Sequence, residues 1–317
     1  MERALSRPLV VAVFGPTAAG KTAFACALAD RLPCRLISCD AFQVYRGLDA
    51  ATAKPEGEER RHAWALVDWV EPDDPVDLAR WVAAAERELE RAWAAGRIPL
   101  VVGGTGMYLR GLLKGVAAAP RRDPALRERL ERLEAVRGPG FLHRVLRRLD
   151  PPLAGRVAPR DLKRIVRGLE VRLATGRPLS AIQAGRWQGP DRWPVVRIGL
   201  DLPRDVLDER IGQRVRRFFH ERDLVGEVER LRRRPGLGPG ANALRGIGYA
   251  ETLAWLEGRS EAGSLDELVE LVARNTRRYA RRQRTWFRRE VPALWLDPRA
   301  PDAVDRAAAE IERARRP

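Results

Sequence analysis

Residues 8–22 read PLVVAVFGPTAAGKT, and this stretch decides the fold. Its first seven residues are apolar and rich in β-branched side chains, as in a buried parallel strand. Residues 15–22 fit the pattern G-x-x-x-x-G-K-[ST], and a helical pattern follows from Thr22 to Leu32. A strand, a glycine-rich loop and a helix in this order bind phosphate through backbone N–H groups and the helix N-terminus. The motif predicts a phosphate or diphosphate ligand, but it does not by itself indicate ATP.

Strand and helix patterns continue to alternate outside this stretch. Short apolar runs at 36–38, 98–102 and 195–200 predict further strands, and a last short strand is expected at 293–296. Helical patterns cover 77–95, 109–113, 204–234 and 264–289, with Asp77 as the expected N-cap of the first. This alternation predicts an α/β fold, with a P-loop-containing parallel-sheet core.

The stretch 120–192 differs from the rest of the chain. It carries 18 Lys and Arg against 8 Asp and Glu, and its helical patterns lie at 124–135, 141–149 and 162–175. We therefore expect two domains. Residues 1–119 plus 193–317 form the P-loop α/β core with C-terminal helices, and 120–192 form a mainly helical, basic insertion whose charge suits a nucleic acid partner.

The composition indicates a globular protein with a polyanionic partner. The chain has 317 residues, 45% apolar and 32% charged, with a net charge of +16, which excludes wholesale disorder and favours nucleic acid as a partner. No apolar run approaches the roughly 18 residues of a membrane span, and the N-terminus lacks a signal-peptide pattern. Three cysteines without metal-ligand spacing suit a reducing compartment, so we expect a cytoplasmic protein without a membrane partner.

Two candidate residues follow the strand at 36–38. Asp40 lies at the carboxyl edge of the sheet, where it could hold Mg²⁺ or accept a proton from a nucleophile, and Gln43 could pair with a base edge. Equally, Asp40 could be a helix N-cap and Gln43 a solvated side chain. The local sequence leaves both interpretations open.

Two further segments carry weaker signals. Residues 103–106, GGTG, follow the strand at 98–102 and place the Thr105 hydroxyl at the same sheet edge, although many strand-to-helix turns look like this. Residues 274–289 hold eight arginines and no acid, interleaved with Tyr279, Trp286 and Phe287. This pattern suits RNA phosphates and unpaired bases, and it also suits an amphipathic helix with its aromatic residues in the core.

Several of these motifs occur together in one order. The chain resembles the tRNA dimethylallyltransferase (tRNA isopentenyltransferase) family from about residue 9 to about residue 296. The motifs are GPTAAGKT (15–22), ISCDAFQVYRGLD (37–49), TAKP (52–55), GGTGMYLRGLL (103–113), DLKRIVRGLEV (161–171), LRGIGYAE (244–251) and RRQRTWFR (281–288). Two positions depart from the family pattern: Ala41 replaces a serine, and Trp64-Ala65 replaces a common His-His pair.

This resemblance implies a reaction. Family members transfer a dimethylallyl group from dimethylallyl diphosphate to N6 of adenosine 37 in tRNAs that carry adenosines at positions 36 and 37. The phosphate loop then holds the donor's diphosphate with the help of Mg²⁺, for which Thr22 is the expected protein ligand, and the enzyme is expected to be a monomer. The implied diphosphate-binding residues are Gly15, Pro16, Thr17, Ala18, Ala19, Gly20, Lys21, Thr22 and Arg214.

The resemblance also assigns catalytic and tRNA-binding roles. Asp40 is the implied general base on the adenine amine, and Thr105 hydrogen-bonds near the reacting centre. The implied tRNA contacts are Asp40, Ala41, Phe42, Gln43, Thr105, Arg127, Lys163, Arg164, Ile165, Val166, Arg167, Arg245, Gly246, Ile247, Gly248, Tyr249 and Ala250.

Three other functions share part of this pattern. A P-loop small-molecule kinase would explain the phosphate loop but not the basic insertion. A prenyltransferase acting on free adenine nucleotides would not need so large a basic surface. A non-catalytic RNA-binding protein would not need Lys21, Thr22 and Asp40 intact.

Overall fold

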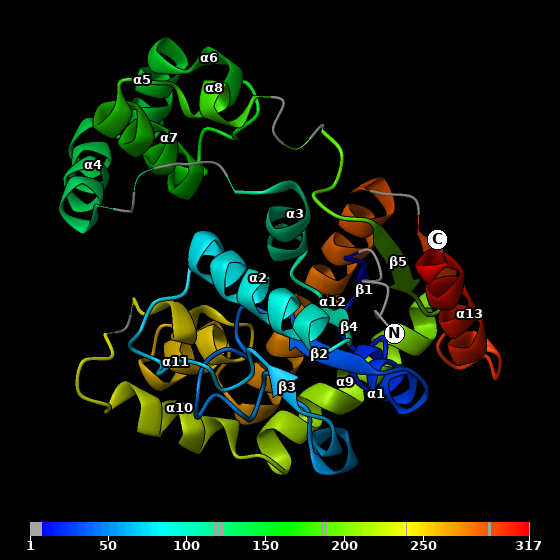
Figure 1. The fold of residues 1–317 in the computed structure, drawn as a ribbon. Coiled ribbons are helices and arrows are strands. Elements are labelled where there is room, and N and C mark those ends of the chain that lie inside the picture. Colours follow the sequence, from blue (N-terminus) through cyan, green and yellow to red (C-terminus); the bar gives the residue numbers. More distant parts are fainter. Residues whose placement is uncertain are drawn as a thin grey trace. The chain divides into compact units, whose positions relative to one another are not determined.

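A parallel sheet forms the centre of the fold (Figure 1). The structure, a computed structural model, describes residues 8–116, 120, 123–184, 187, 189–238, 240–290 and 293–316. Within these ranges the sheet has six strands in the order β3-β2-β4-β1-β5-β6, and every neighbouring pair is parallel. The strands are β1 (Val10–Phe14), β2 (Cys34–Ser38), β3 (Trp64–Ala65), β4 (Ile98–Gly103), β5 (Val195–Leu200) and β6 (Leu294–Leu296). The predicted fold class is confirmed, and only the two-residue β3 was not expected.

Helices cover both faces of this sheet. Val11 and Val13 of β1 pack in one apolar cluster with α1 (Lys21–Arg31) and α13 (Ala303–Arg315). On the other face, Phe14 stacks on Phe287 of α12 (Leu265–Glu290), with ring centroids 4.7 Å apart. β1 is therefore buried from both sides, which explains why its sequence is apolar without alternation.

The strand order brings three loops to one sheet edge. β1 lies between β4 and β5, so the chain leaves β1 for β2 on one side and later enters β5 on the other. Because the strands are parallel, the loops 15–20, 39–44 and 103–105 all begin at their carboxyl ends. Open α/β sheets bind ligands at such a switch point.

The helical elements around the sheet largely follow the expected pattern. α2 (Leu78–Ala94) begins at Asp77, whose side chain accepts a hydrogen bond from the backbone N–H of Arg80, and α3 (Gly106–Lys114) follows β4. The single helical stretch expected at 204–234 is two helices, α9 (Arg204–His220) and α10 (Leu224–Arg232), because Asp223 adopts a left-handed backbone and caps α10. The remaining elements of this unit are η1 (Gly57–Arg61), η2 (Asn242–Arg245) and α11 (Tyr249–Leu256).

The chain divides into two compact units. One comprises Met1–Leu113 with Asp191–Pro317, and the other is Lys114–Pro190. The sequence placed these boundaries at 119/120 and 192/193, and residues 117–119 lie outside the described ranges. The second unit holds α4 (Pro124–Arg137), α5 (Phe141–Leu149), α6 (Pro151–Ala154), α7 (Leu162–Thr175) and α8 (Leu179–Gln183) around its own apolar core. No described helix in either unit is long and apolar enough to cross a membrane.

Candidate active site

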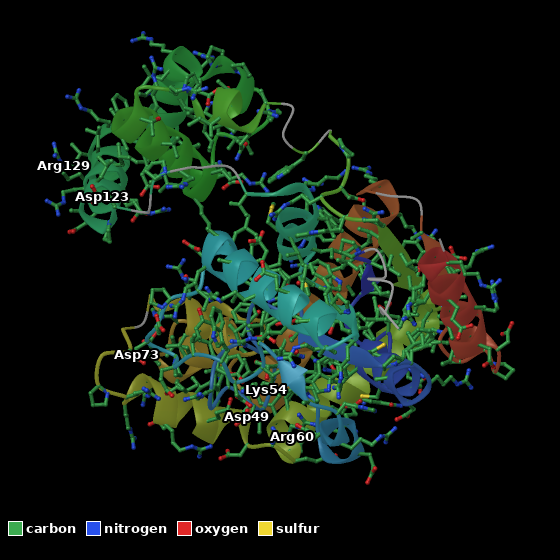
Figure 2. The ribbon with its side chains drawn as sticks, viewed as in Figure 1. Asp49, Lys54, Arg60, Asp73, Asp123 and Arg129 are labelled. Carbon is green, nitrogen blue, oxygen red and sulfur yellow. The ribbon has the colours of Figure 1, made fainter. Side chains whose placement is uncertain are left out.

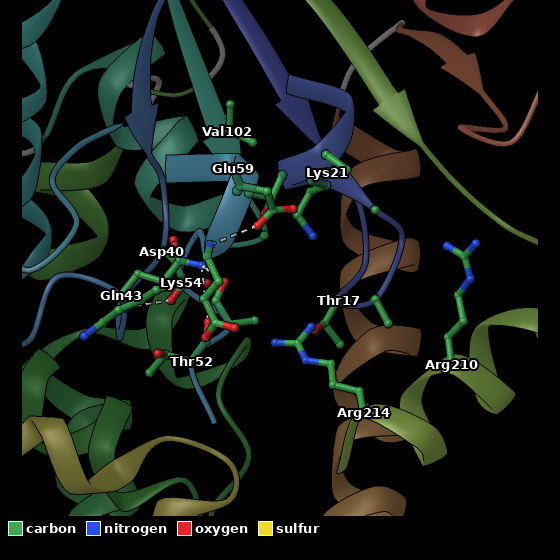
Figure 3. A pocket seen from close by; sticks show the side chains of 18 of the residues that line it. Thr17, Lys21, Asp40, Gln43, Thr52, Lys54, Glu59, Val102, Arg210 and Arg214 are labelled. Atoms are coloured by element: carbon green, nitrogen blue, oxygen red, sulfur yellow. Dashed lines mark hydrogen bonds between the residues drawn. The ribbon is translucent and has the colours of Figure 1, made fainter. Parts of the chain in front are cut away.

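The phosphate loop borders a cavity of about 480 Å³ at this sheet edge (Figure 3). Gly15 and Gly20 have φ values of 153° and 82°, which L side chains rarely adopt, and a Cβ on Gly15 would lie 2.2 Å from the carbonyl oxygen of Leu200. Of the predicted diphosphate-binding residues, Thr17, Ala18, Gly20, Lys21, Thr22 and Arg214 line the cavity. Gly15, Pro16 and Ala19 shape the loop without lining it.

Two partly buried cations flank this loop. Lys21 Nζ donates a hydrogen bond to the Pro16 carbonyl at 2.8 Å, and Arg214 Nη1 donates to Thr17 Oγ1 at 2.9 Å. Burial, reinforced by the charge of Arg214, lowers the pKa of Lys21 to about 8. Burial likewise lowers the pKa of Arg214 to about 10. Two cations that share a desolvated site favour an anionic ligand, which would relieve their repulsion.

The cavity continues along one face of α9. Arg210 and Arg217 line it together with Arg214, and their spacing of three and four residues places all three on the same side of the helix. Sequence reasoning identified only Arg214. The periodicity of the other two was visible in the sequence, but an Arg-rich chain offers many such patterns.

Asp40 lies across the cavity from these cations (Figure 3). It is two residues beyond Ser38, the last residue of β2. Its Oδ1 accepts hydrogen bonds from the backbone N–H groups of Phe42 at 2.9 Å and Gln43 at 3.3 Å. Oδ2 accepts no hydrogen bond from the part of the chain that the structure describes. One carboxylate oxygen thus caps the following turn, although no helix begins there, and the other has no partner among the described residues. The role of Asp40 as a base or metal ligand stays a prediction.

Thr105 and Gln43 support this turn. Thr105 Oγ1 accepts a hydrogen bond from the Ala41 N–H at 3.3 Å, and Thr105 is not among the residues that line the cavity. The Gln43 amide donates to the carbonyls of Thr52 and Ala53 and accepts from Ser38 Oγ. The amide of Gln43 is therefore engaged within the protein, and its contact with a base stays a prediction.

Lys54 anchors the next loop. This lysine is only 3% exposed, and its Nζ donates to the Tyr45 carbonyl at 2.7 Å, Asp49 Oδ1 at 2.6 Å and Asp68 Oδ1 at 2.5 Å. Figure 2 labels Lys54 and Asp49. A compact ammonium can satisfy three converging oxygens that a planar guanidinium would not fit. Lys54 is one of only four lysines among 59 basic residues.

We expect Lys54→Met to destabilise the protein. The variant leaves three oxygens without their shared donor, which costs about 1–3 kcal/mol in the free energy of unfolding, measured by urea titration. The control is Arg60→Met, because the Arg60 side chain is 63% exposed and lies 4.0 Å from Asp68. Equal destabilisation by both variants would contradict an anchoring role for Lys54.

Two of the predicted tRNA-binding segments meet in this unit. The Phe42 ring lies against Gly246, where an added Cβ would approach it to 3.1 Å. Tyr249 is 1% exposed, and its hydroxyl donates to Glu227 Oε1 at 2.6 Å. Glu227 also accepts from the backbone N–H groups of Asp49 and Ala50. Glu227 was not predicted, because its partners lie 22 to 178 residues away along the chain.

The other predicted tRNA contacts lie within the insertion. Arg127 and Arg167 both pair with Glu170, at 3.4 Å and 2.7 Å, and Glu170 is 1% exposed. Ile165 and Val166 have no exposed surface and belong to the apolar core of this unit. The side chains of Ile165 and Val166 therefore stabilise the packing of α7. The neighbouring Lys163 and Arg164 are exposed at its surface.

The donor set for a metal ion is small. Thr22 and Asp40 line the same cavity. Among the described residues, no cluster of three His, Cys, Asp or Glu side chains is suited to hold an ion. Burial raises the pKa of Cys26 and Cys34 to about 11, so these thiols stay protonated and are poor ligands. The arrangement fits Mg²⁺, which in phosphate sites uses one or two protein oxygens and completes its coordination with phosphate oxygens and water.

Comparisons with known proteins identify the relatives of this chain. The family model described as IPP transferase matches residues 43–290, and the one described as isopentenyl transferase matches residues 8–63. A tRNA dimethylallyltransferase of Anaeromyxobacter dehalogenans is 44% identical over 91% of this chain and 95% of its own length. The counterpart from Thermomicrobium roseum is 40% identical over 98% of this chain and 92% of its own.

Two solved structures are similar to this chain in both fold and sequence. The tRNA isopentenylpyrophosphate transferase of Bacillus halodurans has a TM-score of 0.71 and 32% identity, covering 98% of this chain and 97% of that one. A eukaryotic dimethylallyltransferase acting on tRNA has a TM-score of 0.78 and 25% identity, covering 98% and 80%. The chain therefore belongs to the tRNA dimethylallyltransferase family.

Proposed function

We propose that this enzyme transfers a dimethylallyl group from dimethylallyl diphosphate to N6 of adenosine 37 in tRNAs with adenosines at positions 36 and 37. One observation carries the proposal: a single cavity is lined by the partly buried cations Lys21 and Arg214 on one side and by Asp40 on the other. Family membership supports the same reaction. The site offers charge stabilisation for a diphosphate leaving group and a base for an incoming amine.

The leaving-group side follows from electrostatics. Cleavage of the allylic C–O bond places negative charge on the diphosphate, and donors fixed before the reaction stabilise that charge as it develops. Lys21, Arg214 and the N–H groups at the start of α1 are such donors. They are partly buried, so their attraction for the diphosphate is screened less than it would be in water.

The acceptor side needs a proton acceptor. An exocyclic adenine amine is a weak nucleophile, and Asp40 Oδ2 can take its proton as the new N–C bond forms. The target base must leave its stack to reach this carboxylate, which costs a few kcal/mol. Thr105 and the turn at 41–43 hold Asp40 in place for this step.

A divalent cation, which we propose is Mg²⁺, would be held by Thr22 and Asp40 together with the diphosphate oxygens. It would add positive charge beside the leaving group. Variants of Asp40 distinguish a metal ligand from a general base.

The proposed tRNA surface comprises the turn at 40–43, the segment 245–250 and the basic insertion. Basic side chains of Arg127, Lys163, Arg164, Arg167 and Arg245 would contact phosphates. Such contacts compensate for the cost of extruding the base. We further propose that the enzyme acts as a monomer in the cytoplasm, in contact with no membrane.

One assay tests the function and its rivals. The protein is mixed with Mg²⁺, labelled dimethylallyl diphosphate and unmodified tRNA, with parallel reactions containing AMP or labelled ATP. We expect label in the tRNA, none when adenosine 37 is replaced, and no product with AMP or ATP. Transfer to AMP would identify a nucleotide prenyltransferase, and phosphoryl transfer from ATP a kinase. Tight tRNA binding without transfer would identify an RNA-binding protein.

A further inference from the structure

We propose that Gln283 is a positioning residue that sets the spacing between the phosphate loop and the loop that supports Asp40. This inference deepens the proposed function and rests on it, since it explains how the donor and acceptor sides of one cavity are kept in register. Gln283 lies in the Arg-rich stretch at 274–289, which the sequence linked only to RNA or to core packing.

The Gln283 side chain joins two loops that are far apart in the sequence. It is 6% exposed, its Oε1 accepts a hydrogen bond from the Thr17 N–H at 2.9 Å, and its Nε2 donates to the Gly104 carbonyl at 2.9 Å. Each half of the amide thus contacts one loop. Thr17 belongs to the phosphate loop and also receives Arg214 on its hydroxyl.

The other contact continues toward Asp40. Gly104 immediately precedes Thr105, which accepts the Ala41 N–H and donates its own N–H to the Cys39 carbonyl. Cys39 and Ala41 are the two chain neighbours of Asp40. A continuous path of hydrogen bonds and covalent bonds therefore runs from the diphosphate side, through one amide, to the backbone around the carboxylate.

The packing of α12 fixes this amide. Arg284 pairs with Asp201 through Nε and Nη2, and Arg288 pairs with the same carboxylate. A Cβ on Gly104 would lie 2.3 Å from Gln283 Nε2, and one on Gly106 would lie 2.3 Å from the Trp286 ring. Gly104 and Gly106 therefore permit the close approach of α12 to this loop.

The neutral amide of Gln283 offers both a donor and an acceptor at any pH. Methionine has a similar length and removes both hydrogen bonds. Glutamate keeps an acceptor for the Thr17 N–H, but when ionised it places a carboxylate against the Gly104 carbonyl and beside the anion site. A protonated glutamic acid can donate to Gly104 again. Burial raises the pKa of a carboxyl group, so a glutamic acid at this 6% exposed position should begin to protonate as the pH falls from 8 to 6. The Glu variant should therefore recover over that range, which a residue needed only for packing would not do.

The test compares Gln283→Met and Gln283→Glu with wild type in the full chain. We expect both to lower kcat/KM for dimethylallyl diphosphate about 10- to 100-fold at pH 8, because loosened reacting groups lose alignment. tRNA affinity should change less than about threefold, since the described contacts of Gln283 are internal. Between pH 8 and pH 6 the activity of Gln283→Glu relative to wild type should rise at least about threefold, and that of Gln283→Met should stay constant.

The control is Thr276→Val, on the same buried face of α12. The Thr276 hydroxyl donates only to the Val272 carbonyl within its own helix, so the variant tests destabilisation of α12 without loss of a loop contact. Equal losses in Thr276→Val, or activities of both Gln283 variants within twofold of wild type, would overturn the proposal. So would a Gln283→Glu deficit that does not change with pH.

A second measurement separates this inference from the proposed function. Binding of inorganic pyrophosphate, followed by calorimetry, should weaken in Gln283→Met, and hydrogen exchange in the peptide that contains Thr17 should accelerate. Neither readout requires turnover. If wild type transfers no dimethylallyl group but these differences appear, the proposed function fails and the positioning role stands. If wild type is active and exchange in both variants matches it, the positioning role fails.

Discussion

Replacing Asp40 with asparagine is expected to lower kcat by about 10²- to 10⁴-fold while dimethylallyl diphosphate and tRNA still bind. Asparagine can keep an oxygen on the backbone N–H groups of Phe42 and Gln43, so the turn should persist. It cannot accept the proton that the adenine amine must lose. The measurement is single-turnover transfer with preformed enzyme–tRNA complex, together with separate titrations of both substrates.

Two companion variants sharpen this result. Asp40→Ala also removes the cap on the turn, so it should weaken tRNA binding in addition to slowing transfer. Asp30→Asn removes an exposed carboxylate on α1 that pairs with Arg61, and it should leave transfer unchanged. If Asp40→Asn turns over within threefold of wild type, Asp40 is not the base. If its loss is rescued by raising the Mg²⁺ concentration, Asp40 serves chiefly as a metal ligand.

The sheet and its loops were predictable because their signals are local. A buried strand, a glycine loop and a helix start lie within 15 residues at positions 8–22, and the same logic located β4 and β5. β3 was not predicted, because a strand of two residues shows no periodicity. The break between α9 and α10 was not predicted, because one aspartate with a left-handed backbone does not interrupt the helical pattern of the sequence.

The supporting residues of the site were not predictable in the same way. Gln283 contacts Thr17 across 266 positions of sequence, and Glu227 contacts Asp49 across 178. In both cases a polar side chain on a helix satisfies backbone groups of a distant loop, so no spacing rule connects the partners. The glycines at 104 and 106 were recognisable as part of a strand-to-helix turn, but their contacts with Gln283 and Trp286 were not.

The second large effect concerns Lys21. Lys21→Met should lower kcat/KM for dimethylallyl diphosphate about 10²- to 10³-fold, since one buried donor to the developing charge is lost and the apolar stem is kept. The control on the same helix is Arg31→Met, whose guanidinium is half exposed and pairs with Asp305 at the surface. A loss of less than tenfold in Lys21→Met would mean that Arg214 and the loop amides suffice.

The lowered pKa of Lys21 also predicts how activity depends on pH. Below pH 8 the ammonium is charged and attracts the diphosphate, and as the pH rises through about 8 the free enzyme loses that charge. kcat/KM for the donor should therefore fall on the alkaline side with an apparent pKa near 8. A bound diphosphate stabilises the charged form, so kcat should remain flat to higher pH. In Lys21→Met the alkaline fall in kcat/KM should disappear, and its persistence would assign the titration to another group.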